Sequence, residues 1–157
     1  MHSNGNMGQP SRSQNFLIGD VNGHGKAEMV QIWMSKNATL NLVVYGLTTN
    51  GLATLYAGNI GGYVFDVLGW LISDVDGNGN AEIIQLNNDY SSVSMNIYHW
   101  VNGTISMLGP YLADIASAES WLVDDIDGDG RAEISQQWDN EGQLGDGPHL
   151  STDRNET

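Results

Sequence analysis

Short runs of apolar, β-branched and aromatic residues, separated by turns rich in Gly, Asn and Asp, make up most of this chain. Residues 40–45 and 93–98 have the composition typical of β-strands. Asn50-Gly51 and Asn102-Gly103 follow these two runs and are typical of tight hairpin turns. Because no long 3.6-residue periodicity occurs, the pattern predicts an all-β protein.

The same pattern recurs along the chain. Residues 16–20, 70–74 and 121–125 align with one another, and each segment leads into an acidic, Gly-rich loop that ends in Ala-Glu. The Asp residues that open these loops are 54 and then 51 positions apart. A period of about 40 to 50 residues with four strands per unit is typical of β-propeller blades. We therefore predict blades of four-stranded antiparallel sheet, with fourth strands at 52–56 and 105–108.

The third unit ends before its third strand. After Leu144 the chain continues with Gly-Asp-Gly-Pro-His-Leu and a polar tail, and Pro148 argues against a central strand there. About two and a half blades form an incomplete ring unless copies associate head to tail or the chain belongs to a larger assembly. The predicted parts are a flexible N-terminal arm (1–15), two blades (16–69 and 70–120), a partial blade (121–144) and a polar tail (145–157).

Acidic residues dominate the charge of the chain, with 19 Asp and Glu against 5 Lys and Arg and a formal net charge of −14. Nucleic acids and anionic lipids require clustered basic residues, so the deficit of Lys and Arg argues against a nucleic-acid partner and against docking on such lipids. No apolar stretch approaches the roughly 18 to 20 residues of a membrane span, which argues against membrane insertion. The absence of Cys excludes disulfides and thiolate zinc sites.

The acidic charge is concentrated in the three loops, which share the pattern Asp-x-(Asp/Asn)-Gly-x-Gly-x-Ala-Glu. Side chains at positions 1, 3, 5 and 9 can turn toward one point, and glycines at positions 4 and 6 permit the tight curl. Calcium requires 6 to 8 oxygen ligands at about 2.3 to 2.6 Å, and such a loop with a carbonyl from position 7 can supply them. An EF-hand needs Glu at position 12, where this chain has Gln31, Gln85 and Gln136.

The run Trp-Leu-x-x-Asp-x-Asp-Gly-x-Gly-x-Ala-Glu-Ile, over residues 70–83 and 121–134, resembles the FG-GAP/VCBS repeats. These are similar to the calcium-loop blades of integrin α-subunit propellers, and the resemblance covers about residues 16–144. It implies an ion between the first and second strands of each blade. The ligands it implies are the side chains of Asp20, Asn22, His24, Glu28, Asp74, Asp76, Asn78, Glu82, Asp125, Asp127, Asp129 and Glu133, and the carbonyls of Lys26, Asn80 and Arg131.

The sequence predicts up to three calcium ions of graded affinity. The loop of Asp125 offers four carboxylates, the loop of Asp74 offers three and the loop of Asp20 offers two. Affinity rises with ligand charge, so the Asp125 loop should bind most strongly and the Asp20 loop most weakly. His24 is a poor ligand for a hard cation, which weakens the first loop further.

No catalytic arrangement is visible, and we predict that the chain is not an enzyme. The four His residues show no metal-pair spacing, and neither a Gly-x-Ser-x-Gly elbow nor a phosphate-binding Gly loop is present. Five Trp residues raise the question of sugar binding. Trp70 and Trp121 align with Phe16 and are expected to pack in the core, whereas Trp100 is the expected surface aromatic.

The predicted function is therefore an extracellular binding or adhesion module for a protein or glycan ligand, in which calcium stabilises the blade hairpins. Extracellular calcium is concentrated enough to saturate weak sites, which favours a secreted location. The first 15 residues are polar and contain no signal peptide. Two alternatives remain open, a lectin-like propeller and a non-binding accessory segment of a larger secreted enzyme or toxin.

Overall fold

The computed structural model describes residues 15–35, 39–61, 67–89, 92–113 and 120–137. This part of the chain consists of strands, turns and loops, and it contains no helix that could cross a membrane. The prediction of an all-β protein is confirmed. The predicted arm except Asn15, the end of the third unit (138–144) and the polar tail (145–157) lie outside the described residues.

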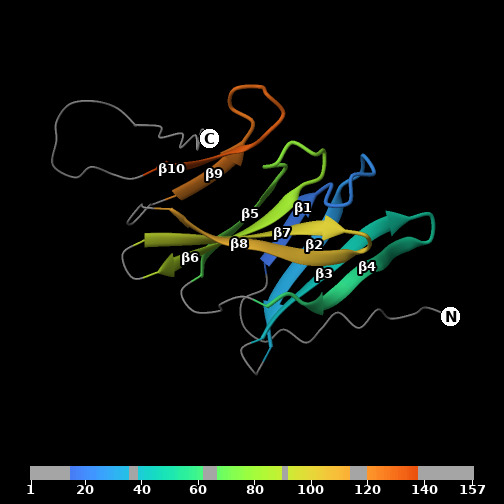
Figure 1. The fold of residues 1–157 in the computed structure, drawn as a ribbon. Helices are drawn as coiled ribbons and strands as arrows, with labels where there is room; N and C mark the ends of the chain where they lie inside the picture. Colours follow the sequence, from blue (N-terminus) through green and yellow to red (C-terminus); the bar gives the residue numbers. More distant parts are fainter. Residues whose placement is uncertain (1–14, 36–38, 62–66, 90–91, 114–119, 138–157) are drawn as a thin grey trace, which may run out of the picture.

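Two four-stranded sheets and one two-stranded hairpin make up the fold (Figure 1). The first sheet contains, in spatial order, β1 (Asn15–Gly19), β2 (Glu28–Met34), β3 (Leu40–Thr48) and β4 (Gly51–Asn59). The second sheet contains β5 (Val67–Ser73), β6 (Glu82–Asp89), β7 (Ser92–Val101) and β8 (Thr104–Ala113). β9 (Ser120–Asp124) and β10 (Glu133–Gln137) form the hairpin. All pairs are antiparallel, as predicted, and join strands that follow one another in the chain.

The Asn-Gly signals mark real turns. Asn102 and Gly103 connect β7 to β8 and have φ values of 50° and 83°, as a two-residue hairpin turn of this type requires. Gly51, with φ of 109°, opens β4 directly after the preceding turn. The strands on either side run further than the composition indicated, and β8 continues to Ala113 rather than ending at residue 108.

The hydrophobic core lies between successive sheets. Val30 and Ile32 of β2, together with β3 residues of the same face, pack against Ile83 and Tyr98 of the second sheet. On the opposite face of the second sheet, Ile84 packs against the β9–β10 hairpin in a second cluster. Neighbouring residues of β6 thus point into different interfaces, as the two-residue period of a strand dictates. β1 lies against β5 and β5 against β9, so the first strands of the three sheets are adjacent.

The aromatic residues serve mainly to join the sheets. Trp70 stacks on Tyr98 with ring centroids 6.2 Å apart and packs against the core between the first two sheets, which we call the first cluster. Trp121 packs against the second cluster, between the second sheet and the hairpin. Both were expected in the core, and both are there. Trp100 was expected at the surface, but it is half-buried and packs against the first cluster. Part of the Trp100 side chain is thus exposed and part contacts the core, and its position beside a turn did not reveal the second contact.

A buried Gln recurs at the same place in each second strand. Tyr98 donates a hydrogen bond from its hydroxyl to Oε1 of Gln85 (2.9 Å), and Tyr45 does the same to Gln31 (3.2 Å). The equivalent Gln136 of β10 is also buried, and within the described residues neither of its side-chain polar atoms has a partner. In the two four-stranded sheets a Tyr of the third strand binds the equivalent Gln, and the described part of the third unit ends at Gln137.

The acidic loops are joined to one another as well as to their strands. We call residues 20–28, 74–82 and 125–133 the first, second and third loops. The Ala81 N–H donates to the Asp20 carbonyl and the Ala132 N–H donates to the Asp74 carbonyl, both at 2.7 Å. Each bond therefore links the eighth residue of one loop to the first residue of the loop before it.

Gly23 allows the second loop to approach the first. A Cβ at Gly23 would clash with the Asn80 side chain, whereas a Cβ at Gly25 would meet nothing within 4 Å. The two glycines have similar φ values of 72° and 74°, so an Ala at either carries a similar backbone strain of roughly 1 to 2 kcal/mol. We expect Gly23→Ala to lower the free energy of unfolding by about 1 kcal/mol more than Gly25→Ala, because only the former displaces a neighbour. Urea denaturation of the two variants measures the difference, and equal losses would contradict this contact.

Candidate metal centre

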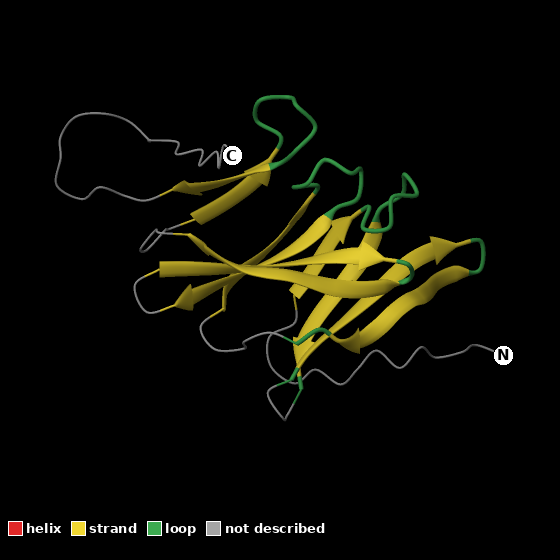
Figure 2. Ribbon diagram, in the orientation of Figure 1, coloured by secondary structure: helices red, strands yellow, loops and turns green. Residues whose placement is uncertain are grey.

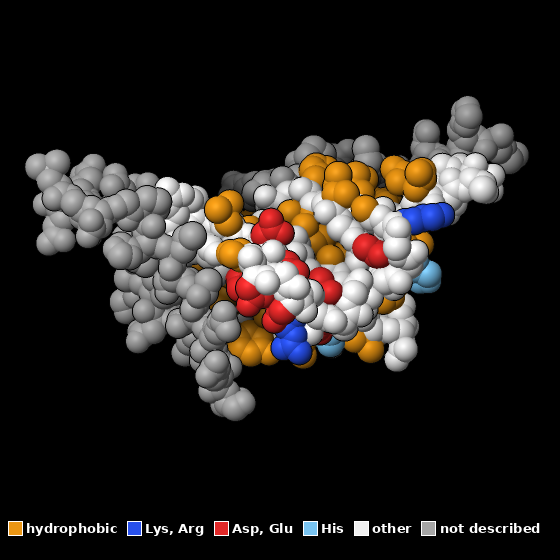
Figure 3. All heavy atoms as spheres, turned by 90° about the horizontal axis from the view of Figure 1, so that it is seen from above, with side chains coloured by type: hydrophobic (Ala, Val, Ile, Leu, Met, Phe, Trp, Pro, Cys, Tyr) orange, Lys and Arg blue, Asp and Glu red, His pale blue; other side chains and the backbone are white. Residues whose placement is uncertain are grey.

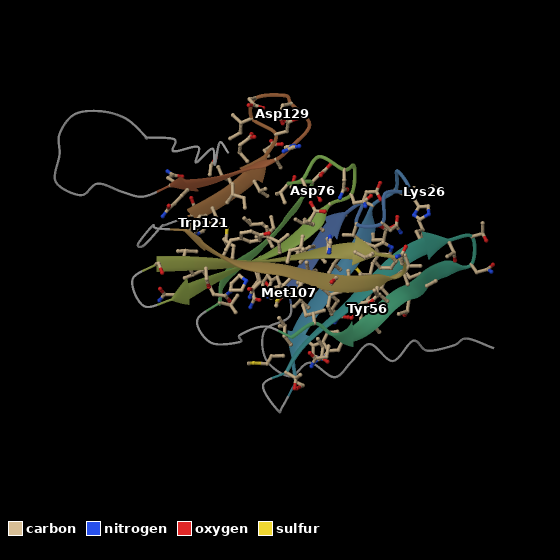
Figure 4. The ribbon with its side chains drawn as sticks, viewed as in Figure 1. Lys26, Tyr56, Asp76, Met107, Trp121 and Asp129 are labelled. Atoms are coloured by element: carbon tan, nitrogen blue, oxygen red, sulfur yellow. The ribbon has the colours of Figure 1, made fainter. Side chains whose placement is uncertain are left out.

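The three acidic loops lie side by side at one end of the molecule (Figure 2), and each connects the first two strands of its sheet. Figure 4 shows Lys26, Asp76 and Asp129 on these neighbouring loops. Both glycines in each loop have left-handed φ values, from 72° at Gly23 to 90° at Gly130, as the sequence predicted. The same local sequence therefore produces the same curl three times.

The first Asp of each loop organises the backbone around it. In the second loop, Oδ1 of Asp74 accepts hydrogen bonds from the N–H groups of Gly77 (2.7 Å) and Asn78 (3.2 Å), and Oδ2 accepts one from Gly79 (2.7 Å). Asp20 accepts equivalent bonds in the first loop, and Asp125 does so in the third. A carboxylate held by several N–H groups is fixed in position, which favours a preformed site.

The glutamate at position 9 closes each loop. Its Oε2 accepts a hydrogen bond from the N–H of the residue at position 2, so that the start of the second strand returns to the start of the loop. The three bonds run from Val21 to Glu28 (3.1 Å), from Val75 to Glu82 (3.0 Å) and from Ile126 to Glu133 (2.8 Å). One oxygen of each glutamate is thus bound to the backbone, and Glu28 is also hydrogen-bonded by the Asn22 side chain.

The second loop gathers three carboxylates around one point. Asp74, Asp76 and Glu82 each place an oxygen within 4.8 Å of the others. Glu82 is only 1% exposed, and its buried Oε1 has no hydrogen-bond partner among the described residues. Burial, and then the charges of Asp76 and Asp74, raise the pKa of Glu82 to about 7 from its usual 4.5. A buried anionic oxygen with no donor beside two further carboxylates fits a bound cation.

The third loop gathers Asp125, Asp127 and Glu133 in the same way, again within 4.8 Å. The two Asp residues are exposed and Glu133 is half-buried, so this group is more open to water than the second. Asp129 was predicted as a fourth carboxylate, but it is not part of this group. Its Oδ1 accepts the Arg131 N–H at 2.9 Å.

The first loop brings together Asp20, Asn22 and Glu28 in the same backbone frame, but it lacks a group of three acids because Asn22 and His24 take positions 3 and 5. Nδ1 of His24 lies 2.5 Å from Oδ1 of Asn22, so these two side chains are hydrogen-bonded to each other. Glu28 is buried, and burial raises its pKa. The ranking of the three loops by affinity remains a prediction.

The residues at position 7, predicted as carbonyl ligands, have a second role that sequence reasoning missed. The side chains of Asn80 and Arg131 lie over Gly23 and Gly77, the position-4 glycines of the preceding loops. The N–H groups of Asn80 and Arg131 bind the position-5 side chains of their own loops, at 2.7 and 2.9 Å. The repeated glycine was the available signal, since a close approach is one reason for Gly at a fixed position.

The loops together form an acidic face. Seen from above in Figure 3, the Asp and Glu side chains gather on the face to which the three loops belong. Carboxylates as close as those of the second and third loops repel one another, and a divalent cation removes that repulsion. The arrangement can therefore bind a cation, and it offers oxygen ligands almost exclusively.

Without metal, stability should depend on pH through Glu82. A carboxyl whose pKa is about 7 in the folded state and 4.5 in the unfolded state contributes its full stability below pH 4.5 and loses it as the pH rises through 7. We expect the chelated protein to unfold at a higher temperature at pH 5 than at pH 8. Glu82→Gln should reduce this difference, and an equal pH dependence in variant and wild type would contradict the buried, uncompensated carboxylate.

Comparison of the chain with protein-family models, with curated proteins and with solved structures found no match. The interpretation of the site therefore depends on the loops themselves. They supply two groups of three carboxylates that could hold a metal ion, one of them with a buried oxygen that lacks a donor.

Proposed function

We propose that this protein is a calcium-binding repeat protein whose sheets are β-propeller blades of the FG-GAP/VCBS type, and that calcium stabilises their hairpins. The observation that carries the proposal is the Oε1 atom of Glu82, which is buried next to Asp74 and Asp76 with no donor in the part of the chain that the structure describes. A carboxylate in that position costs folding free energy unless a cation or a proton neutralises it. The loop that holds it joins the first two strands of a sheet, so a bound ion would fix the start of that sheet.

The ligand chemistry favours calcium over other divalent ions. The second and third loops offer carboxylate, amide and backbone oxygens and neither Cys nor His, which disfavours zinc and other borderline metals. Magnesium keeps several waters and demands near-octahedral geometry, whereas calcium accepts a crowded, irregular shell of protein oxygens. A nine-residue loop with three converging carboxylates suits the irregular oxygen shell of calcium.

We infer an extracellular binding or adhesion module rather than an enzyme as the setting for these sites. Calcium outside cells would keep such loops occupied continuously, so the ions would serve as structural parts rather than as signals. The ligand of such a module would be a protein or a glycan. Trp100 lends no support to the lectin-like alternative, because its half-buried side chain packs against the core between the first two sheets.

Calorimetric titration with calcium tests the metal assignment. We expect saturable binding to at least two sites, with one site lost in Asp127→Ala. Asn22→Ala is the matched control, because Asn22 holds the same position 3 in the first loop and adds no charge. It should leave both sites intact. Absence of saturable binding at millimolar calcium, or equal binding of magnesium, would contradict the assignment.

A further inference from the structure

The first sheet exposes apolar side chains at positions that the second sheet buries. Phe16 and Ile18 of β1 are 52% and 72% exposed. The corresponding residues of β5 are Trp70 and Ile72, and both pack against the core cluster that the first sheet provides. What covers β5 in the second sheet is therefore a preceding sheet, and nothing in the described part of the chain takes that place beside β1.

The first sheet and the β9–β10 hairpin are the two ends of the row of sheets, and the hairpin end shows the complementary exposure. Leu122 of β9 is 61% exposed, and Ile126 at position 2 of the third loop is 52% exposed. In the first sheet, the corresponding Leu17 and Val21 pack in the cluster shared with the second sheet, and Val21 is only 1% exposed. The end formed by the hairpin thus exposes the residues that a following sheet would cover.

Polar groups at the two ends are complementary in the same way. The bond between the Ala N–H and the Asp carbonyl of successive loops occurs twice. Within the described residues, the corresponding Ala27 N–H at one end and Asp125 carbonyl at the other have no such partner. A position-7 side chain covers Gly23 and Gly77, whereas a Cβ at Gly128 would have nothing within 4 Å.

Charge also favours contact between these two ends. The position-7 residue of the first loop is Lys26, which is exposed at the first end. In the internal contacts this position lies over the position-4 glycine of the preceding loop. At the other end that glycine is Gly128, between the exposed Asp127 and Asp129. Lys26 would therefore meet the most acidic of the three loops.

We propose that the protein associates head to tail with a second copy of itself through these surfaces. The first-end surface consists of Phe16, Ile18, Lys26 and the Ala27 N–H, and the last-end surface consists of Leu122, Ile126, Gly128 and the Asp125 carbonyl. The contact repeats an interface that the chain already makes twice, so it requires no new complementarity. Such an interface is heterologous and joins two different surfaces. It does not depend on calcium for its apolar and backbone contacts.

Size measurement in solution tests the proposal directly. Light scattering after gel filtration should give masses that rise from 17.0 kDa to at least twice that value as the protein concentration increases. Ile18→Asp and Leu122→Asp should each restore 17.0 kDa. Val101→Asp is the control, since Val101 is also an exposed apolar residue but lies at the β7–β8 turn. It should associate like the wild type.

Mixing the two end variants distinguishes a head-to-tail contact from a symmetric one. Ile18→Asp retains an intact last end and Leu122→Asp retains an intact first end, so the mixture should form a pair of twice 17.0 kDa that neither variant forms alone. Circular dichroism confirms that each variant is folded. A wild type that stays at 17.0 kDa at all concentrations, or a mixture of folded variants that does not pair, would overturn the proposal. Further repeats of a longer chain would then be the partners of these ends.

Discussion

Removal of calcium is expected to lower the unfolding midpoint of this protein by about 10 °C. A ligand that binds only the folded state adds RT ln(1 + [L]/Kd) to the free energy of unfolding, which is about 2.7 kcal/mol per site at one hundred times Kd. Two weaker sites together contribute a similar amount. For a chain of 157 residues each 1 kcal/mol corresponds to roughly 2 to 4 °C, so 2.7 kcal/mol corresponds to roughly 5 to 11 °C.

The structural reason for so large an effect is the number of carboxylates that the fold brings together. Without an ion, the second and third loops each hold three carboxylates whose oxygens lie within 4.8 Å of one another. In the unfolded chain the same groups separate and are hydrated. The ion therefore stabilises the folded state mainly by removing a repulsion that only the folded state has.

Thermal unfolding followed by circular dichroism measures this effect. The protein is melted in excess calcium, again after addition of a chelator, and once more after calcium is restored. The last midpoint should return to the first, which separates metal removal from damage. Magnesium at the same ionic strength is the control for screening of the −14 charge. An unchanged midpoint in chelator would contradict the proposed metal sites.

Local sequence determines most of the backbone conformation of the loops, so this conformation could be predicted from the sequence. The glycines of the pattern predicted left-handed backbone, and Gly77 and Gly79 have φ of 75° and 88°. The Asp at position 1 and the Glu at position 9 were predicted to converge, and in the second and third loops they do. Strand order followed as well, because hairpins join residues that are close along the chain.

Contacts between sheets were not predictable, because they depend on how units separated by more than 50 residues stack. Trp100 packs against the core between the first two sheets, and nothing in its own segment indicates that. Similarly, Asp129 has the same spacing as the other loop acids but falls outside the cluster. Arg131 lies over Gly77 of another loop, a role that no periodicity along the chain encodes.

The burial of Glu82 depends both on the sequence of its own loop and on contacts between loops, and it leads to the most specific prediction. Glu28, Glu82 and Glu133 occupy the same position in identical local patterns, yet Glu82 is 1% exposed and Glu133 is half-buried. Glu28 is also buried, at 5% exposed, and each of the two buried glutamates belongs to a loop that another loop follows: Ala81 bonds to Asp20, and Ala132 bonds to Asp74. Glu82 is the least exposed of the three, so its charge is the most costly without a cation.

Glu82→Gln is therefore expected to have opposite effects in the presence and absence of calcium. In chelator the variant should be more stable than the wild type by about 1 to 3 kcal/mol, the range for satisfying a buried polar group. The Gln oxygen can still accept the Val75 N–H, and its amide can donate to Asp74 or Asp76 in place of the unpartnered Oε1. In calcium the variant should be less stable, because one site has lost a charged ligand.

Urea denaturation at pH 8, with and without calcium, measures both differences, and Glu133→Gln is the matched control. Glu133 accepts the Ile126 N–H in the same way but is half-buried, so its replacement should lower stability in calcium and change it little in chelator. If Glu82→Gln is more stable than the wild type in chelator and less stable in calcium, and Glu133→Gln does not show this reversal, burial rather than the number of ligands determines the effect. Destabilisation of the Glu82 variant in both conditions would instead mean that its carboxylate is needed for the fold itself, and that a cation is not what its buried oxygen lacks.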